Sequence, residues 1–230
     1  MARKDDSNLL SRVKTALARL DDREAPKLPA ALAPDVKEFR SNTGPLLTAA
    51  EKAAETLGAR DKALEKVGDA DATLDVSIDD LADGIVGAKL GKRTTPFAGL
   101  SKHSPSALKS LAYKTEVDAV VDLLKALAKK NPPAAVKALA AKVQKNAATV
   151  QKLLDALTGP EARHVKARTA RDALLAGASK AYGRFKLRAK AALLDEPGAY
   201  EAMFAGRAAV QAPVKKKAKK KVTKKGATPA

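Results

Sequence analysis

The sequence predicts an all-α protein, an elongated antiparallel multi-helix bundle with coiled-coil-like packing and a disordered C-terminal tail. Apolar residues recur at spacings of three and four along most of the 230 residues, which is the spacing of one helix face. There is no alternating run of β-branched residues and no Asn-Gly hairpin signal, so strands are not expected. Alanine dominates the apolar 45% and aromatic residues make up only 3%. We therefore expect long helices with thin contacts lined by leucine and valine.

Residues 1–90 are predicted to form the acidic half of the bundle. Ser7 can cap a first helix, whose apolar face is formed by Leu9, Leu10, Val13, Leu17 and Leu20. The segment 26–34 contains three prolines and is predicted to be a linker.

Glycines and prolines predict further helix boundaries in this half. A short helix starting at Pro34 is expected to stop near Gly44. Pro45 suits the first turn of the next helix, which Gly68 is expected to end or weaken. A last stretch runs up to Gly87 and carries its apolar residues at helical spacing: Leu74, Ile78, Leu81 and Ile85.

Residues 91–104 are predicted to form a basic loop, followed by the basic half of the same bundle at 105–207. Ser104 and Pro105 start a helix that is expected to continue to Asn131. Its inner face is formed by Val117, Val120, Leu124 and Leu127. A sharp turn is expected at 131–133.

The helix predicted from Pro133 to Leu157 has the clearest pattern of the chain. Val136, Val143, Val150 and Leu157 repeat every seven residues, and Leu139, Asn146 and Leu153 fill the complementary seam. This pattern is typical of a coiled-coil face, so a homo-oligomer through helix 133–158 is possible. Asn146, the one polar member, is expected to face solvent or water.

Residues 158–160 (Thr-Gly-Pro) predict a stop, and Pro160 then restarts a long basic helix to about Leu194. The candidate nucleic-acid-binding residues on this helix are Lys166, Lys180, Arg184 and Arg188, which share one flank. Contact with phosphates competes with two other interpretations, a solvated face and an anionic lipid surface. A final helical turn at 200–207 is expected to dock on the bundle through Tyr200 and Phe204.

Residues 208–230 are predicted to form a disordered lysine-rich tail, because so few apolar groups cannot offset the entropy of ordering it. Eight lysines and no acid lie between Pro213 and Ala230: Lys215, Lys216, Lys217, Lys219, Lys220, Lys221, Lys224 and Lys225. The segment resembles the lysine-, alanine- and proline-rich tails of linker histones and of histone-like bacterial proteins. The resemblance implies binding to DNA phosphates, and the helical body does not share it.

The net charge of +18 is unevenly distributed. Residues 1–85 carry −4, residues 86–212 carry +14 and the last eighteen residues carry +8. This asymmetry favours a polyanionic partner. The acids at 69–83 could instead hold the lysine tail in cis.

Catalytic and metal-binding functions are not indicated by the sequence. There is no cysteine and there are only two histidines, His103 and His164. A calcium loop beginning at Asp69 would need glycine and glutamate where Leu74 and Asp80 stand. We expect no enzyme activity, no cofactor and no metal. Membrane insertion is not expected either, because no stretch approaches about 18 uninterrupted apolar residues, and the N-terminus lacks the apolar segment of a signal peptide.

The predicted function is non-enzymatic, non-specific binding of nucleic acid through the lysine-rich tail and the basic helix. The predicted location is the cytoplasm, in association with the nucleoid. Two alternatives remain open. One is a helical scaffold whose tail binds an acidic protein partner. The other is a phasin-like coat protein that covers hydrophobic granules.

Overall fold

The computed structural model describes residues 4–22 and 28–204, and all regular structure in these ranges is helical. The elements are α1 (Lys4–Asp21), the 3-10 helix η1 (Ala30–Leu32), α2 (Ala33–Gly87), α3 (Pro105–Leu108), α4 (Tyr113–Ala128), α5 (Ala134–Ala192) and α6 (Pro197–Phe204). The described part has no strand, and its β pairing is an isolated bridge between Lys92 and Thr95. The all-α prediction is confirmed. The predicted tail at 208–230 lies outside the described residues.

Helices α2 and α5 are longer than predicted, because Pro45 and Pro160 lie inside them. The predicted stops at Gly44 and Thr158–Pro160 are therefore wrong, and Gly68 does not end a helix either, because α2 continues through it. A proline removes one backbone hydrogen bond, but most helical stability in proteins comes from packing an apolar face. Buried residues lie on both sides of each proline: Phe39 and Leu46, and Leu157 and Ala167.

Two other predicted boundaries need correction. Ser7 does not begin α1, which starts at Lys4. Ser104 does cap a helix, since its hydroxyl accepts a hydrogen bond from the Ala107 amide at 3.2 Å. That helix, α3, has only four residues, and α4 starts anew at Tyr113 after the extended residue Ala112.

The end of α4 agrees with the sequence. Asn131 adopts a left-handed backbone conformation with φ of 43°, which asparagine tolerates better than most residues. Pro132 and Pro133 follow it before α5 begins. This turn gives α4 and α5 the short connection that was predicted.

The chain divides into two compact units, each of which contains residues from both charge halves. We call residues 45–176 the central unit. We call residues 1–44 together with 177–230 the terminal unit.

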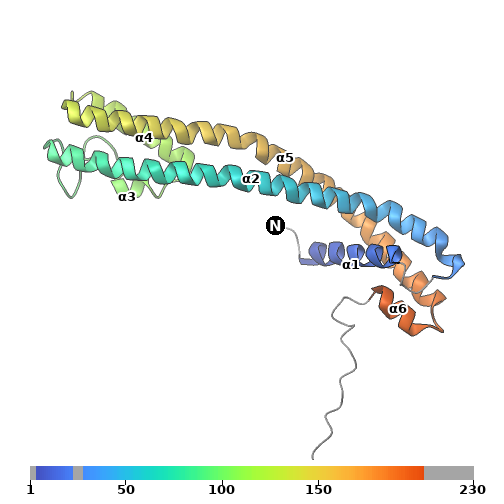
Figure 1. The fold of residues 1–230 in the computed structure, drawn as a ribbon. Helices are drawn as coiled ribbons and strands as arrows, with labels where there is room; N and C mark the ends of the chain where they lie inside the picture. The colour runs from blue at the N-terminus through green and yellow to red at the C-terminus, as the bar shows by residue number, and fades with distance from the viewer. Residues whose placement is uncertain (1–3, 23–27, 205–230) are drawn as a thin grey trace, which may run out of the picture. The chain divides into compact units, whose positions relative to one another are not determined.

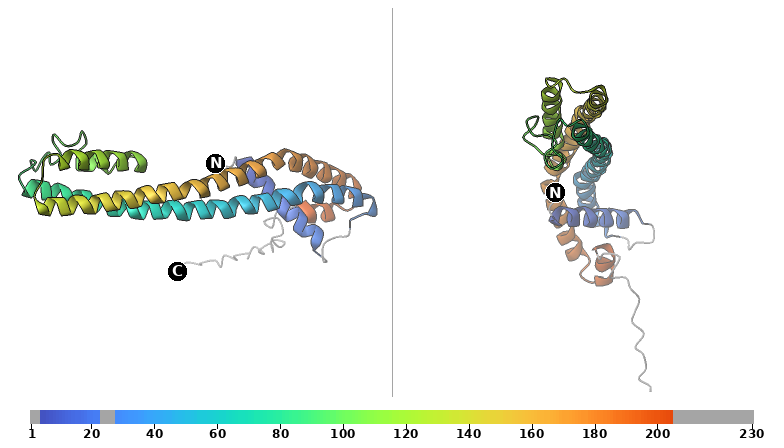
Figure 2. Two further views of the ribbon diagram at one scale, coloured as in Figure 1. Left: turned by 90° about the horizontal axis from the view of Figure 1, so that it is seen from above. Right: turned by 90° about the vertical axis from the view of Figure 1, so that its left-hand side faces the viewer.

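In the central unit, α2 and α5 run antiparallel, side by side, with α4 packed against them (Figures 1 and 2). Lys142 Nζ lies 2.8 Å from an Asp80 carboxylate oxygen, and Asn146 Nδ2 donates to the Thr73 carbonyl at 3.4 Å. The heptad residues of α5 are buried within the chain itself, against α2 and α4: Val136, Val143 and Val150. Asn146 thus contacts α2, where the sequence suggested solvent or water.

The terminal unit has an aromatic core. The rings of Phe39 and Phe185 stack with centroids 4.9 Å apart, and Phe204 of α6 approaches Phe185 at 5.5 Å. Tyr200 lies 5.0 Å from Phe204. The predicted docking of Tyr200 and Phe204 is confirmed, and it takes place on the end of α5 within this unit.

The interior position of Pro160 leads to a stability prediction. Replacing Pro160 with alanine should restore the hydrogen bond to the Ala156 carbonyl and stabilise the central unit by up to about 3 kcal/mol. Pro133→Ala is the matched control, because Pro133 precedes the first residue of α5 and breaks no helical bond. Thermal unfolding should show a clear increase for Pro160→Ala alone; equal effects of the two substitutions would contradict this account.

Candidate functional site

The outer surface of α5 in the central unit carries a row of cations. Helix α5 contains thirteen Lys/Arg and three Asp/Glu, whereas α2 contains six and twelve. Lys145, Lys152 and Lys166 are separated by multiples of seven residues, so they share one helix edge. Arg163 precedes Lys166 by one turn. All four side chains are exposed, and none forms an ion pair with another described residue. We call these four residues the α5 row.

Several other cations of the central unit are held by carboxylates. Lys142 pairs with Asp80 at 2.8 Å, and Lys109 pairs with Asp79 at 2.7 Å. Exposed pairs of this kind contribute little stability, but they compensate the charge of the amines. The four cations of the α5 row have no such partner among the described residues, so their charge is available to an external anion.

A groove between α2 and α5 lies beside the α5 row. It has a volume of about 460 Å³, and Arg163 and Lys166 contribute to its lining together with Lys52 and Thr56 of α2. The Thr56 hydroxyl lies 3.5 Å from His164 Nδ1. Alanines line much of the rest, and Glu55, which pairs with Lys52 at 3.1 Å, also contributes. The groove therefore combines an apolar floor with a charged edge, on which Arg163 and Lys166 have no ion pair among the described residues.

The structure places the predicted body residues in both units. Lys166 belongs to the central unit, and the other three belong to the terminal unit, where they follow one another at intervals of four residues. Lys180 is exposed and has no ion pair among the described residues. Arg184 pairs with Glu38 at 2.6 Å, and Arg188 pairs with the buried Asp35 at 3.2 Å. The two arginines thus tie α5 to α2.

The eight lysines predicted to supply most of the affinity lie outside the described residues. Lys145 and Lys152 were not among the predicted binding residues. Their shared heptad position with Lys166 was the signal that could have identified them. Sequence reasoning placed them on the helix predicted to end at Leu157, and the continuity of α5 joins them to Lys166 in one row.

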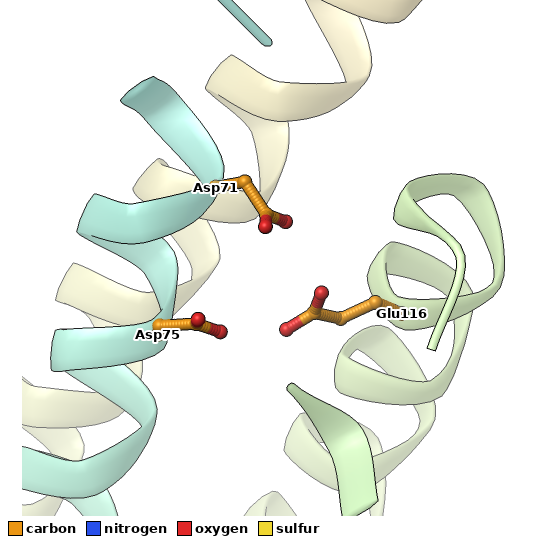
Figure 3. A group of neighbouring side chains, drawn as sticks. All are labelled: Asp71, Asp75 and Glu116. Atoms are coloured by element: carbon orange, nitrogen blue, oxygen red, sulfur yellow. The ribbon is translucent and has the colours of Figure 1, made fainter. Parts of the chain in front are cut away.

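A second feature of the central unit is a cluster of three carboxylates (Figure 3). Asp71 and Asp75 lie one turn apart on α2, and Glu116 of α4 points toward them. Burial, which has the largest effect, and the negative charges of Asp71 and Asp75 together raise the pKa of Glu116 to about 8. Burial also raises the pKa of Asp71.

Sequence reasoning missed Glu116. The sequence did contain an indication that Glu116 is buried, because it falls at an inward position of α4. The inward residues recur at spacings of three and four: Tyr113, Glu116, Val120, Leu123 and Leu127. Asp71 similarly interrupts the buried series of α2 between Val67 and Leu74. A charged residue at a core position of a helix is rarely buried without a partner.

Comparisons with protein-family models, with curated proteins and with solved structures found no match to this chain. Among the described residues, no helix combines the length and the apolar character needed to cross a membrane. Function must therefore be inferred from the residues and their arrangement.

Proposed function

We propose that this chain is a non-enzymatic protein that binds nucleic acid through the phosphate backbone, without sequence specificity. The observation that supports the proposal best is the α5 row, four exposed cations without a carboxylate partner among the described residues. The eight lysines between Pro213 and Ala230 add a second cationic segment. We place the protein in the nucleoid, where DNA is the most abundant polyanion.

The dimensions of the α5 row suit a duplex. At 1.5 Å per residue, Lys145 and Lys166 are about 32 Å apart along α5, close to the roughly 34 Å of one turn of B-DNA. Lysine is a compact point charge on a flexible stem, which favours phosphates over base edges. Neutralising phosphates releases condensed counterions, so binding should weaken steeply as salt rises.

We propose different roles for the four body residues predicted from the sequence, on the basis of their ion pairs. Lys166 and Lys180 are the ones we propose to contact phosphates. Arg184 and Arg188 would first have to leave Glu38 and Asp35. We therefore expect these arginines to contribute less to binding than the lysines.

Charge-neutral substitution of the row tests the proposal. In the full-length protein, the triple change Lys145→Gln, Lys152→Gln and Lys166→Gln should weaken DNA binding and reduce the salt slope by roughly 3. Glutamine has nearly the helix propensity of lysine, so α5 should be retained. The measurement is fluorescence anisotropy of a labelled duplex at several salt concentrations.

A charge-matched triple separates position from net charge. Lys62, Lys66 and Lys130 are also exposed and lie outside α5, and their change to glutamine removes the same three charges. We expect the slope to fall clearly less for this control. If both triples weakened binding equally, net charge would account for the effect and the α5 row would have no role.

A further inference from the structure

The carboxylate cluster of the central unit brings oxygen ligands together from two helices. One carboxylate oxygen from each of Asp71, Asp75 and Glu116 lies within 4.8 Å of the other two. Figure 3 shows the Glu116 carboxylate directed at the two aspartates of α2. The three groups therefore converge on one point between α2 and α4.

Glu116 provides an independent indication of a ligand. Its side chain is fully buried, at 0% relative exposure, and neither carboxylate oxygen has a hydrogen-bond partner. One oxygen of Asp71 and one of Asp75 are likewise buried without a partner. Unpaired charge in a protein interior is costly, and the nearby amine of Lys109 pairs with Asp79 instead. The cluster needs a positive charge from outside the chain or a proton.

We propose that Asp71, Asp75 and Glu116 bind one divalent cation of the Ca²⁺ or Mn²⁺ type. Carboxylate oxygens are the preferred ligands of such ions. Oxygens that are each 2.3–2.6 Å from one Ca²⁺ can be up to roughly 5 Å apart, which accommodates the cluster.

This site differs from the calcium loop that the sequence excludes. Its third ligand comes from α4 and not from the acidic segment 69–83, so the loop pattern of the sequence does not describe it. A bound ion would link α4 to α2 at a point where their carboxylates otherwise repel each other. The site is separate from the α5 row, so it does not depend on the proposed nucleic-acid binding.

Calorimetric titration of the chelator-treated full-length protein tests the site. We expect saturable one-to-one binding of Ca²⁺ or Mn²⁺ and at least tenfold weaker binding by Glu116→Gln. Asp83→Asn is the matched control, because Asp83 is an exposed acid on α2, the helix of Asp71 and Asp75, and lies outside the cluster. It should bind the ion as the wild type does.

The test distinguishes loss of the site from loss of the fold. Glu116→Gln replaces the buried carboxyl group with an uncharged amide of nearly the same shape, so without metal it should unfold at a temperature at least as high as the wild type. Added Ca²⁺ should then raise the unfolding midpoint of the wild type and of Asp83→Asn, and leave that of Glu116→Gln unchanged. Absence of saturable binding of both ions by the wild type, or equal affinity in Glu116→Gln, would overturn the proposal.

Terbium luminescence gives a second, local measurement. The chain has three tyrosines and no tryptophan, and Tyr113 lies one helical turn before Glu116. Tb³⁺ bound at the cluster should be sensitised through Tyr113, and excess Ca²⁺ should quench the emission. Emission that persists in Tyr113→Phe, or in Glu116→Gln, would place the ion elsewhere and contradict the assignment.

Discussion

Removing residues 213–230 is expected to weaken DNA binding by orders of magnitude near physiological salt and to flatten its salt dependence. The segment carries eight lysines and no acid. If all eight engage phosphates, log K should change with log salt by a slope of roughly −7 from this segment alone. The remaining slope should come from α5. Fluorescence anisotropy of the full-length protein and of a 1–212 truncation measures both quantities.

A full-length variant with the eight lysines changed to glutamine provides the control. It keeps the length of the chain and removes only the charge, so it should bind as the truncation does. If the truncation bound DNA as tightly as the full-length protein with the same slope, the lysine-rich segment would have no part in binding.

In the presence of a chelator, raising the pH from about 5 to about 9 is expected to lower the thermal stability of the wild type. The pKa of Glu116 is about 8 in the folded protein, against 4.5 for an ordinary glutamate. Between these values the folded chain holds a proton that the unfolded chain releases, so the free energy of unfolding falls as pH rises. At about 1.4 kcal/mol per pKa unit, the loss amounts to a few kilocalories per mole.

The variant Glu116→Gln tests whether the pH dependence of stability comes from Glu116. It should lose most of the pH dependence in this window and be more stable than the wild type near pH 9. The groups around Glu116 are Asp71 and Asp75 of α2 and Lys109. The pKa of Asp71 is also raised by burial, which leaves a smaller slope of the same sign. The pKa of Lys109 is raised from 10.5 by its bond to Asp79, so it titrates above the window. Equal pH profiles for the two proteins would contradict the assignment to Glu116.

The sequence predicted the packing faces of the helices better than their ends. The heptad residues from Val136 to Leu157 are buried as expected, and so are Leu74, Ile78, Leu81 and Ile85. The helix ends predicted at Pro45 and Pro160 are wrong. A proline is a local signal for a helix end, but contacts with neighbouring helices can stabilise a helix that continues past it. Whether a helix continues past a proline thus depends on its packing against other helices, and the local sequence around the proline does not contain that information.

The candidate sites show the same difference between local patterns, which the sequence reveals, and tertiary contacts, which it does not. Lys166 was found because it lies on a visibly basic stretch, whereas Lys145 and Lys152 were separated from it by a predicted break that does not exist. The density of acids near Asp75 was recognised as well. The proximity of Asp71 and Asp75 to Glu116 could not be predicted, because it depends on the packing of α4 against α2, two helices that are far apart in the sequence.

The central claim is most directly tested by titrating the full-length protein against two labelled duplexes of unrelated sequence over a series of salt concentrations. We predict equal affinity for both duplexes, binding near physiological salt, and a steep linear fall of log K with log salt. Absence of binding near physiological salt, a slope close to zero, or a strong preference for one sequence would contradict the proposed function.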